Sequence, residues 1–206
     1  MTVAQVIAQA RSGELNGLSA ESYDDAKLLN YINLGVLELY KRFALKVSEA
    51  LITMPDDVTT IFTLSALDPN VHLGDGDLMY VIAAYDEKGD WININAPDDP
   101  LSILTPTFNT VQVPNPVAHA VISIIYAPEP PMIQSTSDDL PLPATLLEAL
   151  LHYIGYRAHG ALNGNLQAEN NSHYQRFELS CAKAKNLGVV TADNMMTRPV
   201  EAKGFI

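Results

Sequence analysis

The spacing of apolar positions changes twice along the chain, from a helical period to a strand-like period and back. Apolar residues recur every three to four positions in residues 3–10 and again in residues 22–46, which places them on one face of a helix. Ser22 is predicted to cap the second helix, with Asp25 three residues later as an acidic variant of the capping box. Two amphipathic helices are therefore expected at the start of the chain.

The middle of the chain has the pattern of an antiparallel β domain. Short runs rich in Ile, Val, Thr and Tyr alternate there with clusters of Pro, Gly, Asn and Asp, which are typical turn residues. We expect about five or six strands between residues 48 and 140. The stretch "PEPPMIQSTSDDLPLP", residues 128–143, is expected to return the chain in an extended form.

The helical period reappears after Pro143, a residue that suits the first turn of a helix. Residues 141–162 are apolar over most of the girth of the predicted helix, which is typical of a helix buried in a bundle or between subunits. A last helix is expected to end just before Gly188, because glycine is favoured immediately after a helix C-terminus. Residues 189–206 show no clear period.

Together these segments predict an α+β protein. Its core is an antiparallel bundle of about four helices, with an antiparallel β domain inserted between the second and third helices. The expected parts are residues 1–47 (first half of the bundle), 48–140 (inserted β domain), 141–188 (second half of the bundle) and 189–206 (extended C-terminal tail).

Charge is concentrated in the predicted β domain. The whole chain carries a net charge of −12, and residues 48–140 hold fourteen acidic residues and one basic residue. The remaining segments hold ten acidic and eleven basic residues. Such a negative field repels nucleic acid. No signal-peptide pattern and no apolar run of roughly 18 residues is present, so no membrane association is expected.

Three polar side chains on the third predicted helix raise the question of a metal site. Glu148, His152 and His159 fall within about 40° of one another on a helical wheel, and His173 on the next helix is a further candidate. Two-metal sites in bundles need Glu-x-x-His motifs on two helices and further glutamates, which this chain lacks. The pattern therefore favours a polar seam that faces water or a neighbouring subunit, and no metal or cofactor is expected.

Acidic residues elsewhere do not form a recognisable catalytic or calcium-binding motif. The group Asp75, Asp77, Asp86 and Glu87 lacks the residue order of an EF-hand loop. The four Asp-Asp pairs are expected to serve turns and a helix N-terminus, because adjacent side chains point apart; the pairs are Asp24–Asp25, Asp56–Asp57, Asp98–Asp99 and Asp138–Asp139. No nucleophile–base or phosphate-binding motif is recognised, so an enzyme is not expected.

A sugar-binding face is the remaining alternative for the β domain. The chain has nine tyrosines and a single tryptophan, Trp91, and an exposed indole is a common stacking platform. Trp91 is instead predicted to be a cross-strand packing residue, because it stands within a strand-like run. The single cysteine, Cys181, excludes an internal disulfide and a cysteine-rich zinc site.

Three blocks of the sequence resemble one family, the head-to-tail adaptor (connector) proteins of short-tailed bacteriophages. The blocks are "SYDDAKLLNYINLGVLELYKRF" (residues 22–43), "TFNTVQVPNPVAHAVISIIYAPEPPMI" (107–133) and "DDLPLPATLLEALLHYIGYRAHGALNGNLQAENNSHYQRF" (138–177). The likeness covers nearly the whole chain to about Leu187. One departure is Gly35, which stands where the family usually has a small alanine.

The resemblance implies a virion structural protein without a catalytic site. Members of the family form a ring, usually of about twelve copies, beneath the portal vertex. The ring seals the portal after packaging, passes double-stranded DNA through a central channel without specific binding, and provides a platform for tail nozzle and fibre proteins. The expected location is the portal vertex of the virion, after assembly in the host cytoplasm, with a role in genome ejection.

The resemblance also suggests where contacts lie. The C-terminal extension is expected to bind the portal protein through Met195, Met196, Arg198, Pro199, Phe205 and Ile206. Subunit contacts in the ring are expected at Glu148, His152, Tyr156, Arg157 and His159. The alternatives are a tail-tube or nozzle component, or a metal- or glycan-binding protein.

Overall fold

The computed structural model describes residues 1–19, 21–160 and 167–189, and these form two units. The helical unit combines Met1–Leu45 with the described residues from Pro130 to Val189, and the β unit comprises Lys46–Glu129. Helices and antiparallel sheets occur together, which confirms the α+β class.

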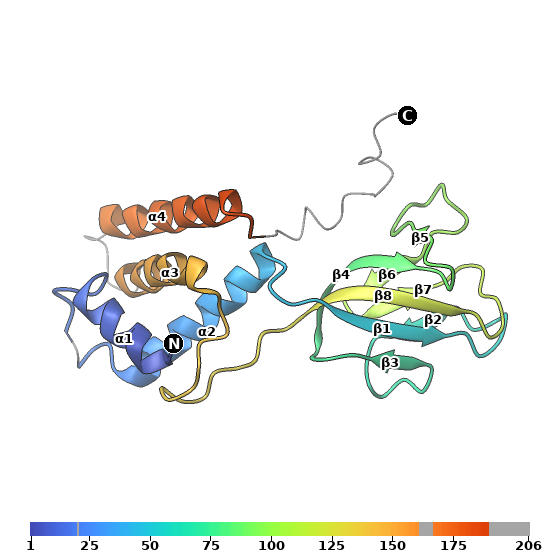
Figure 1. Cartoon of the computed structure of the whole chain (residues 1–206), viewed down its shortest axis with the longest axis horizontal. Coiled ribbons are helices and arrows are strands. Elements are labelled where there is room, and N and C mark those ends of the chain that lie inside the picture. The colour runs from blue at the N-terminus through green and yellow to red at the C-terminus, as the bar shows by residue number, and fades with distance from the viewer. Residues whose placement is uncertain (20, 161–166, 190–206) are drawn as a thin grey trace. The chain divides into compact units, whose positions relative to one another are not determined.

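Four α-helices and one short 3-10 helix build the described part of the helical unit (Figure 1). They are α1 (Val3–Ser12), α2 (Asp25–Arg42), η1 (Ala144–Leu146), α3 (Leu147–Gly160) and α4 (Gln167–Asn186). Helix α3 contacts α1, α2 and α4, so it is the central helix of the unit. No helix in the described ranges is both long and apolar enough to cross a membrane.

The start of α2 differs from the prediction. Asp24, not Ser22, is the N-cap, and its carboxylate accepts a hydrogen bond of 2.8 Å from the backbone N–H of Lys27. The carbonyl of Ser22 instead accepts a hydrogen bond from the Lys27 ammonium group. Ser and Asp both cap helices well. Asp24 is the cap because it directly precedes Asp25, the first residue of α2.

The end of α4 confirms the prediction for Gly188. This residue has φ +89°, a conformation that costs glycine little. Its N–H bonds to the carbonyl of Lys185 (3.0 Å), and the N–H of Val189 bonds to that of Ala184 (3.1 Å). These two bonds form the Schellman motif that closes a helix.

Helices α2 and α3 approach each other closely at Gly35. A Cβ atom at this position would lie 2.5 Å from Cδ1 of Leu150 and 3.0 Å from Cδ1 of Tyr153. Leu150 is fully buried and Tyr153 nearly so. The absence of a side chain at Gly35 therefore lets α3 pack directly on the backbone of α2.

The segment that returns from the β unit lies against the helices. The amide of Asn33 on α2 pairs with both backbone groups of Ile133, at 2.9 Å each. Thr2 forms an isolated antiparallel bridge with Asp139, and the hydroxyl of Tyr40 donates to the carbonyl of Pro141. The sequence placed the boundary of the β region at residue 140, whereas the helical unit begins again at Pro130.

The β unit contains eight strands within the described residues, more than the five or six expected, because several are only two or three residues long. They are β1 (Ser48–Thr53), β2 (Ile61–Thr63), β3 (Val71–Leu73), β4 (Leu78–Tyr85), β5 (Trp91–Ile92), β6 (Leu104–Thr107), β7 (Thr110–Gln112) and β8 (Val121–Pro128). One antiparallel sheet has the order β3-β1-β8-β4-β5 and the other has the order β2-β7-β6 (Figure 1).

The two sheets share one hydrophobic core. Strand β1 contributes Ala50 and Ile52, which pair in register with Ile124 and Ile122 of β8. Phe62 of β2, from the smaller sheet, is fully buried in the same cluster. Alternate residues of β1 point to this core and to solvent, as the period of two predicted.

Candidate functional site

The turn after α1 brings a carboxylate into the helical unit. Gly13 follows the last residue of α1, and the backbone N–H of Leu15 bonds back to the carbonyl of Ala10. Leu15 is 4% exposed and anchors this turn in the core. The neighbouring Glu14 is consequently held inward, and its side chain is only 18% exposed.

Two histidines from different helices converge on this carboxylate. Oε2 of Glu14 lies 2.8 Å from Nδ1 of His173 on α4, and Oε1 lies 3.3 Å from Nδ1 of His152 on α3. The histidine side chains are 11% and 13% exposed. One ligand atom from each of the three residues lies within 4.8 Å of the other two. We call Glu14, His152 and His173 the histidine–glutamate cluster.

A second carboxylate lies on the outer side of His152. Oε1 of Glu148 is 3.7 Å from Nε2 of His152, one helical turn along α3. The same oxygen accepts a hydrogen bond of 3.2 Å from the Lys183 ammonium group on α4. This bond is the main reason that the pKa of Glu148 is lowered. Glu148 is therefore a charged group at the solvent edge of the cluster.

His159 supports the cluster from the inner side. Its ring stacks on that of His173, with centroids 4.7 Å apart and an angle of 15° between the planes. Its Nε2 lies 3.0 Å from the backbone oxygen of Glu14. Burial lowers the pKa of His173 and His159 lowers it further, while the Glu14 carboxylate opposes both. The neutral imidazole of His173 is thus favoured by its surroundings.

Gly155 on α3 makes room for the His173 ring. A Cβ atom at position 155 would lie 2.7 Å from Nδ1 of His173 and within 3.1 Å of two further ring atoms. The ring consequently rests on the backbone of α3. This contact fixes the direction of Nδ1, the atom that faces Glu14.

These positions revise the predicted polar seam. Glu148, His152 and His159 do lie along α3, but the seam does not face water throughout: His159 is 7% exposed, and His152 faces Glu14. Glu14 was missed because nothing in "RSGELNG" marks it, and its partners lie more than a hundred residues away. The predicted interface residues Tyr156 and Arg157 are half-buried and exposed, respectively.

A second polar network links α2 to α4. Arg42 donates hydrogen bonds to Glu38 (2.9 Å) and to Glu178 (2.8 Å), and its guanidinium lies 4.6 Å from the centroid of the Phe177 ring. The bond from Arg42 lowers the pKa of Glu178. Nearby, burial raises the pKa of the Cys181 thiol to about 11. Each charge in this network therefore has a partner within the helical unit.

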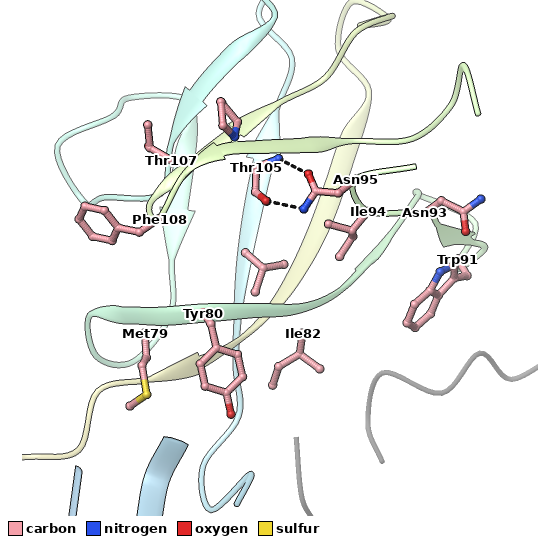
Figure 2. Close-up of a pocket in the computed structure, with 12 residues that line it drawn as sticks. Met79, Tyr80, Ile82, Trp91, Asn93, Ile94, Asn95, Thr105, Thr107 and Phe108 are labelled. Atoms are coloured by element: carbon pink, nitrogen blue, oxygen red, sulfur yellow. Dashed lines mark hydrogen bonds between the residues drawn. The ribbon is translucent and has the colours of Figure 1, made fainter. Parts of the chain in front are cut away.

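The β unit carries an open groove of about 700 Å³ (Figure 2). Asn95 and Thr105 brace one wall through paired hydrogen bonds of 2.7 and 2.8 Å, and Phe108, 78% exposed, lies at the rim. Trp91 packs edge-on against Tyr85, the residue opposite it on β4, with ring centroids 5.5 Å apart. This confirms the predicted cross-strand role of Trp91.

Some acidic residues of the β unit serve turns, as predicted for Asp56. Asp56 accepts hydrogen bonds from the backbone N–H groups of Val58 and Thr59, which lower its pKa. Asp86 does the same for two N–H groups in the turn before β5. Within the described ranges, the histidine–glutamate cluster is the one group of three His, Cys, Asp or Glu side chains close enough to share a metal ion. The predicted portal-binding residues Met195, Met196, Arg198, Pro199, Phe205 and Ile206 lie outside the described residues.

Fold and sites together define a class: an α+β protein with an acidic β unit and a helical unit drawn from both ends of the described chain. The model of the SU10 adaptor protein family matches residues 1–202. The chain therefore belongs to this family of phage head-to-tail adaptors, which are structural proteins of the virion. No curated protein matches the chain.

Proposed function

We propose that the protein is the subunit of a ring-shaped adaptor that binds below the portal, continues the DNA channel and carries the tail nozzle or fibres. The observation that carries this proposal is the family match, which extends over residues 1–202 and so includes both units. A ring of about twelve copies needs two different, complementary surfaces on each subunit.

The outer faces of α3 and α4 are the proposed subunit contacts. Tyr156 on α3 and Tyr174 on α4 form an aromatic pair with ring centroids 5.1 Å apart, and Tyr174 is 41% exposed. Leu179 on α4 and Leu187, directly after the helix, are 63% and 73% exposed. Aromatic and apolar groups of this kind are enriched in the centres of protein interfaces. Arg157 and Glu148 supply charged groups at their border, next to the largely buried His152 and His159.

The acidic β unit supports a role beside a DNA channel. Asp56 and Asp86 are held by turns, and the segment from residue 48 to residue 140 contains a single Lys or Arg, Lys88. Negative charge beside the DNA backbone prevents adhesion. In the proposed ring, this negative charge would let the genome pass through the channel without binding to it.

The C-terminal segment is the proposed portal anchor. Residues 189–206 hold four apolar side chains suited to docking, Met195, Met196, Phe205 and Ile206, together with Arg198 and Pro199. Deletion of residues 190–206 should leave both units folded and abolish capture by immobilised portal protein. Capture that survives the deletion would contradict the assignment of the anchor.

Imaging tests the proposed function as a whole. Electron microscopy of the purified chain, alone and mixed with its portal protein, should show a ring on the portal. A ring that attaches only to another adaptor ring would instead indicate a nozzle or tail-tube component. Particles in which the chain and the portal never associate would reject the adaptor role.

A further inference from the structure

We propose that the histidine–glutamate cluster is a binding site for one divalent transition-metal ion of the zinc class, with Glu14, His152 and His173 as its protein ligands. The ion would join the turn after α1 to helices α3 and α4. Its role would be that of a structural clasp in the helical unit.

The donor set fits this class of ion. Two imidazole nitrogens and one carboxylate oxygen are ligands that zinc, cobalt and iron accept, whereas calcium and magnesium prefer oxygen alone. The three ligand atoms come from three separate chain segments and lie within 4.8 Å of one another. Three protein ligands leave one tetrahedral position for water.

The distances are close to those of a coordinated ion. Bonds of about 2.0–2.2 Å in a tetrahedral site place neighbouring ligand atoms roughly 3.3–3.6 Å apart. Nδ1 of His152 is already 3.3 Å from Oε1 of Glu14. Nδ1 of His173 is 2.8 Å from Oε2, so this pair would open slightly as the ion enters.

The ring nitrogens themselves provide a further argument. Nδ1 of His152 and Nδ1 of His173 are both buried, and neither makes a hydrogen bond of acceptable geometry to any atom of the described chain. Each instead faces the Glu14 carboxylate across a short gap. Buried polar atoms almost always have such a bond, and a shared metal ion satisfies both nitrogens at once.

The surroundings of the cluster resemble the outer shell of a metal site. Histidine ligands commonly direct their second nitrogen at a carboxylate, which fixes the ring and raises its basicity. Nε2 of His152 faces Glu148 at 3.7 Å. His159 stacks on the His173 ring and also contacts the backbone of Glu14. Both groups hold the ligands in place without being ligands themselves.

Metal uptake by the full-length, tag-free chain tests this proposal directly. After treatment with a chelator, the protein is titrated with zinc chloride, and bound metal is measured by elemental analysis. We expect one zinc ion per chain and a higher melting temperature with zinc than without it. Addition of cobalt(II) should give the visible absorption bands of a tetrahedral site. These three wild-type measurements do not depend on any variant folding correctly.

Variants then locate the site. His152→Ala and His173→Ala should each lower the zinc affinity by at least about a hundredfold, because three ligands become two. Glu148→Gln, which alters only the outer carboxylate, should weaken binding by roughly tenfold to a hundredfold. Gly155→Ala keeps every ligand but displaces the His173 ring, so it should also weaken binding. His72→Ala, at an exposed position of the β unit, is the matched control and should change nothing.

Two results would overturn the proposal. The first is a wild-type chain that takes up no zinc in large excess and gives no cobalt bands, which would leave Glu14 as an ion-pair partner of the histidines. The second is full zinc binding by the folded His152→Ala/His173→Ala double variant, which would place the metal elsewhere.

Discussion

The amide side chain of Asn33 on α2 forms two hydrogen bonds with the backbone of Ile133, as a neighbouring strand would, although Ile133 lies 100 positions later in the chain. Ile133 is 4% exposed. Its buried side chain and the hydrogen bonds of the Asn33 amide therefore both hold the returning segment in the helical unit. This relationship joins the two sequence segments that make up the helical unit.

Replacement of Asn33 should loosen that junction. Asn33→Ala leaves the N–H and C=O groups of Ile133 without their partner, which costs about 1–3 kcal/mol of unfolding free energy. Urea denaturation followed by circular dichroism measures the change. Asn30→Ala, at an exposed position of the same helix, is the control and should alter stability by less than about 0.5 kcal/mol. Equal effects of the two substitutions would contradict the role of Asn33.

Gly35→Ala sets two effects against each other. Alanine favours the helix by about 1 kcal/mol over glycine, but its Cβ would meet Leu150 at 2.5 Å and Tyr153 at 3.0 Å. Overpacking of this kind typically costs about 1–3 kcal/mol. We expect a net loss of up to about 2 kcal/mol, measured by denaturation.

A double-mutant cycle separates these two effects. Leu150→Val removes the Cδ1 atom that the new methyl group would strike. In the Leu150→Val background, Gly35→Ala should therefore be less costly than in the wild type, and the coupling energy should be at least about 0.5 kcal/mol. Strict additivity would show that α2 and α3 do not meet at Gly35.

The thiol of Cys181 should be inert in the folded protein. Burial raises its pKa to about 11, and only the thiolate reacts with disulfide reagents. At pH 8 the native chain should react with Ellman's reagent at least about a hundredfold more slowly than the urea-unfolded chain. The assay is unambiguous because the chain has one cysteine. Rapid reaction of the native protein would show that α4 opens readily.

The ion pair between Arg42 and Glu178 should give a pH-dependent contribution to stability. The pKa of Glu178 is lowered in the folded state by the hydrogen bond from Arg42. Its contribution is therefore present above the ordinary glutamate pKa and is lost as the pH falls through the lowered value. Because the Glu178 side chain is 43% exposed, the effect at pH 7 should be only about 0.5–1 kcal/mol.

Comparison of Glu178→Gln with the wild type measures this contribution. The stability difference should be largest near neutral pH and should shrink below roughly pH 4, where carboxylates become protonated. Glu21→Gln, at an exposed position, should show no such dependence. A difference that grows on acidification would reverse the assigned sign.

Local features of the fold could be predicted from the sequence, whereas the cluster could not. The periods of the helices and strands, the Schellman glycine at Gly188 and the turn role of Asp56 depend on neighbouring residues. The inward position of Glu14 depends on contacts with His152 and His173, far away in the chain. The residues next to Glu14 in the sequence therefore could not predict these contacts.

The N-cap of α2 shows that even a local feature can be misassigned when several neighbouring residues are suitable. The stretch "SYDDAK" offers Ser22, Asp24 and Asp25, all of them types found at helix starts. Only the position of the first helical turn, set by the burial of Leu28 and Ile32 against the rest of the unit, decides in favour of Asp24.

The chain enters and leaves the β unit on adjacent strands, with Ser48 of β1 directly opposite Tyr126 of β8. From the side of the helical unit, residues 46–129 are one long insertion. The pairing of β1 with β8 holds the two ends of this insertion close together. The entropic cost of closing a loop rises only slowly with its length. In this protein the folding of the β unit brings the two ends of the insertion together. For this reason the helical unit should require of the inserted unit only that its first and last strands are neighbours.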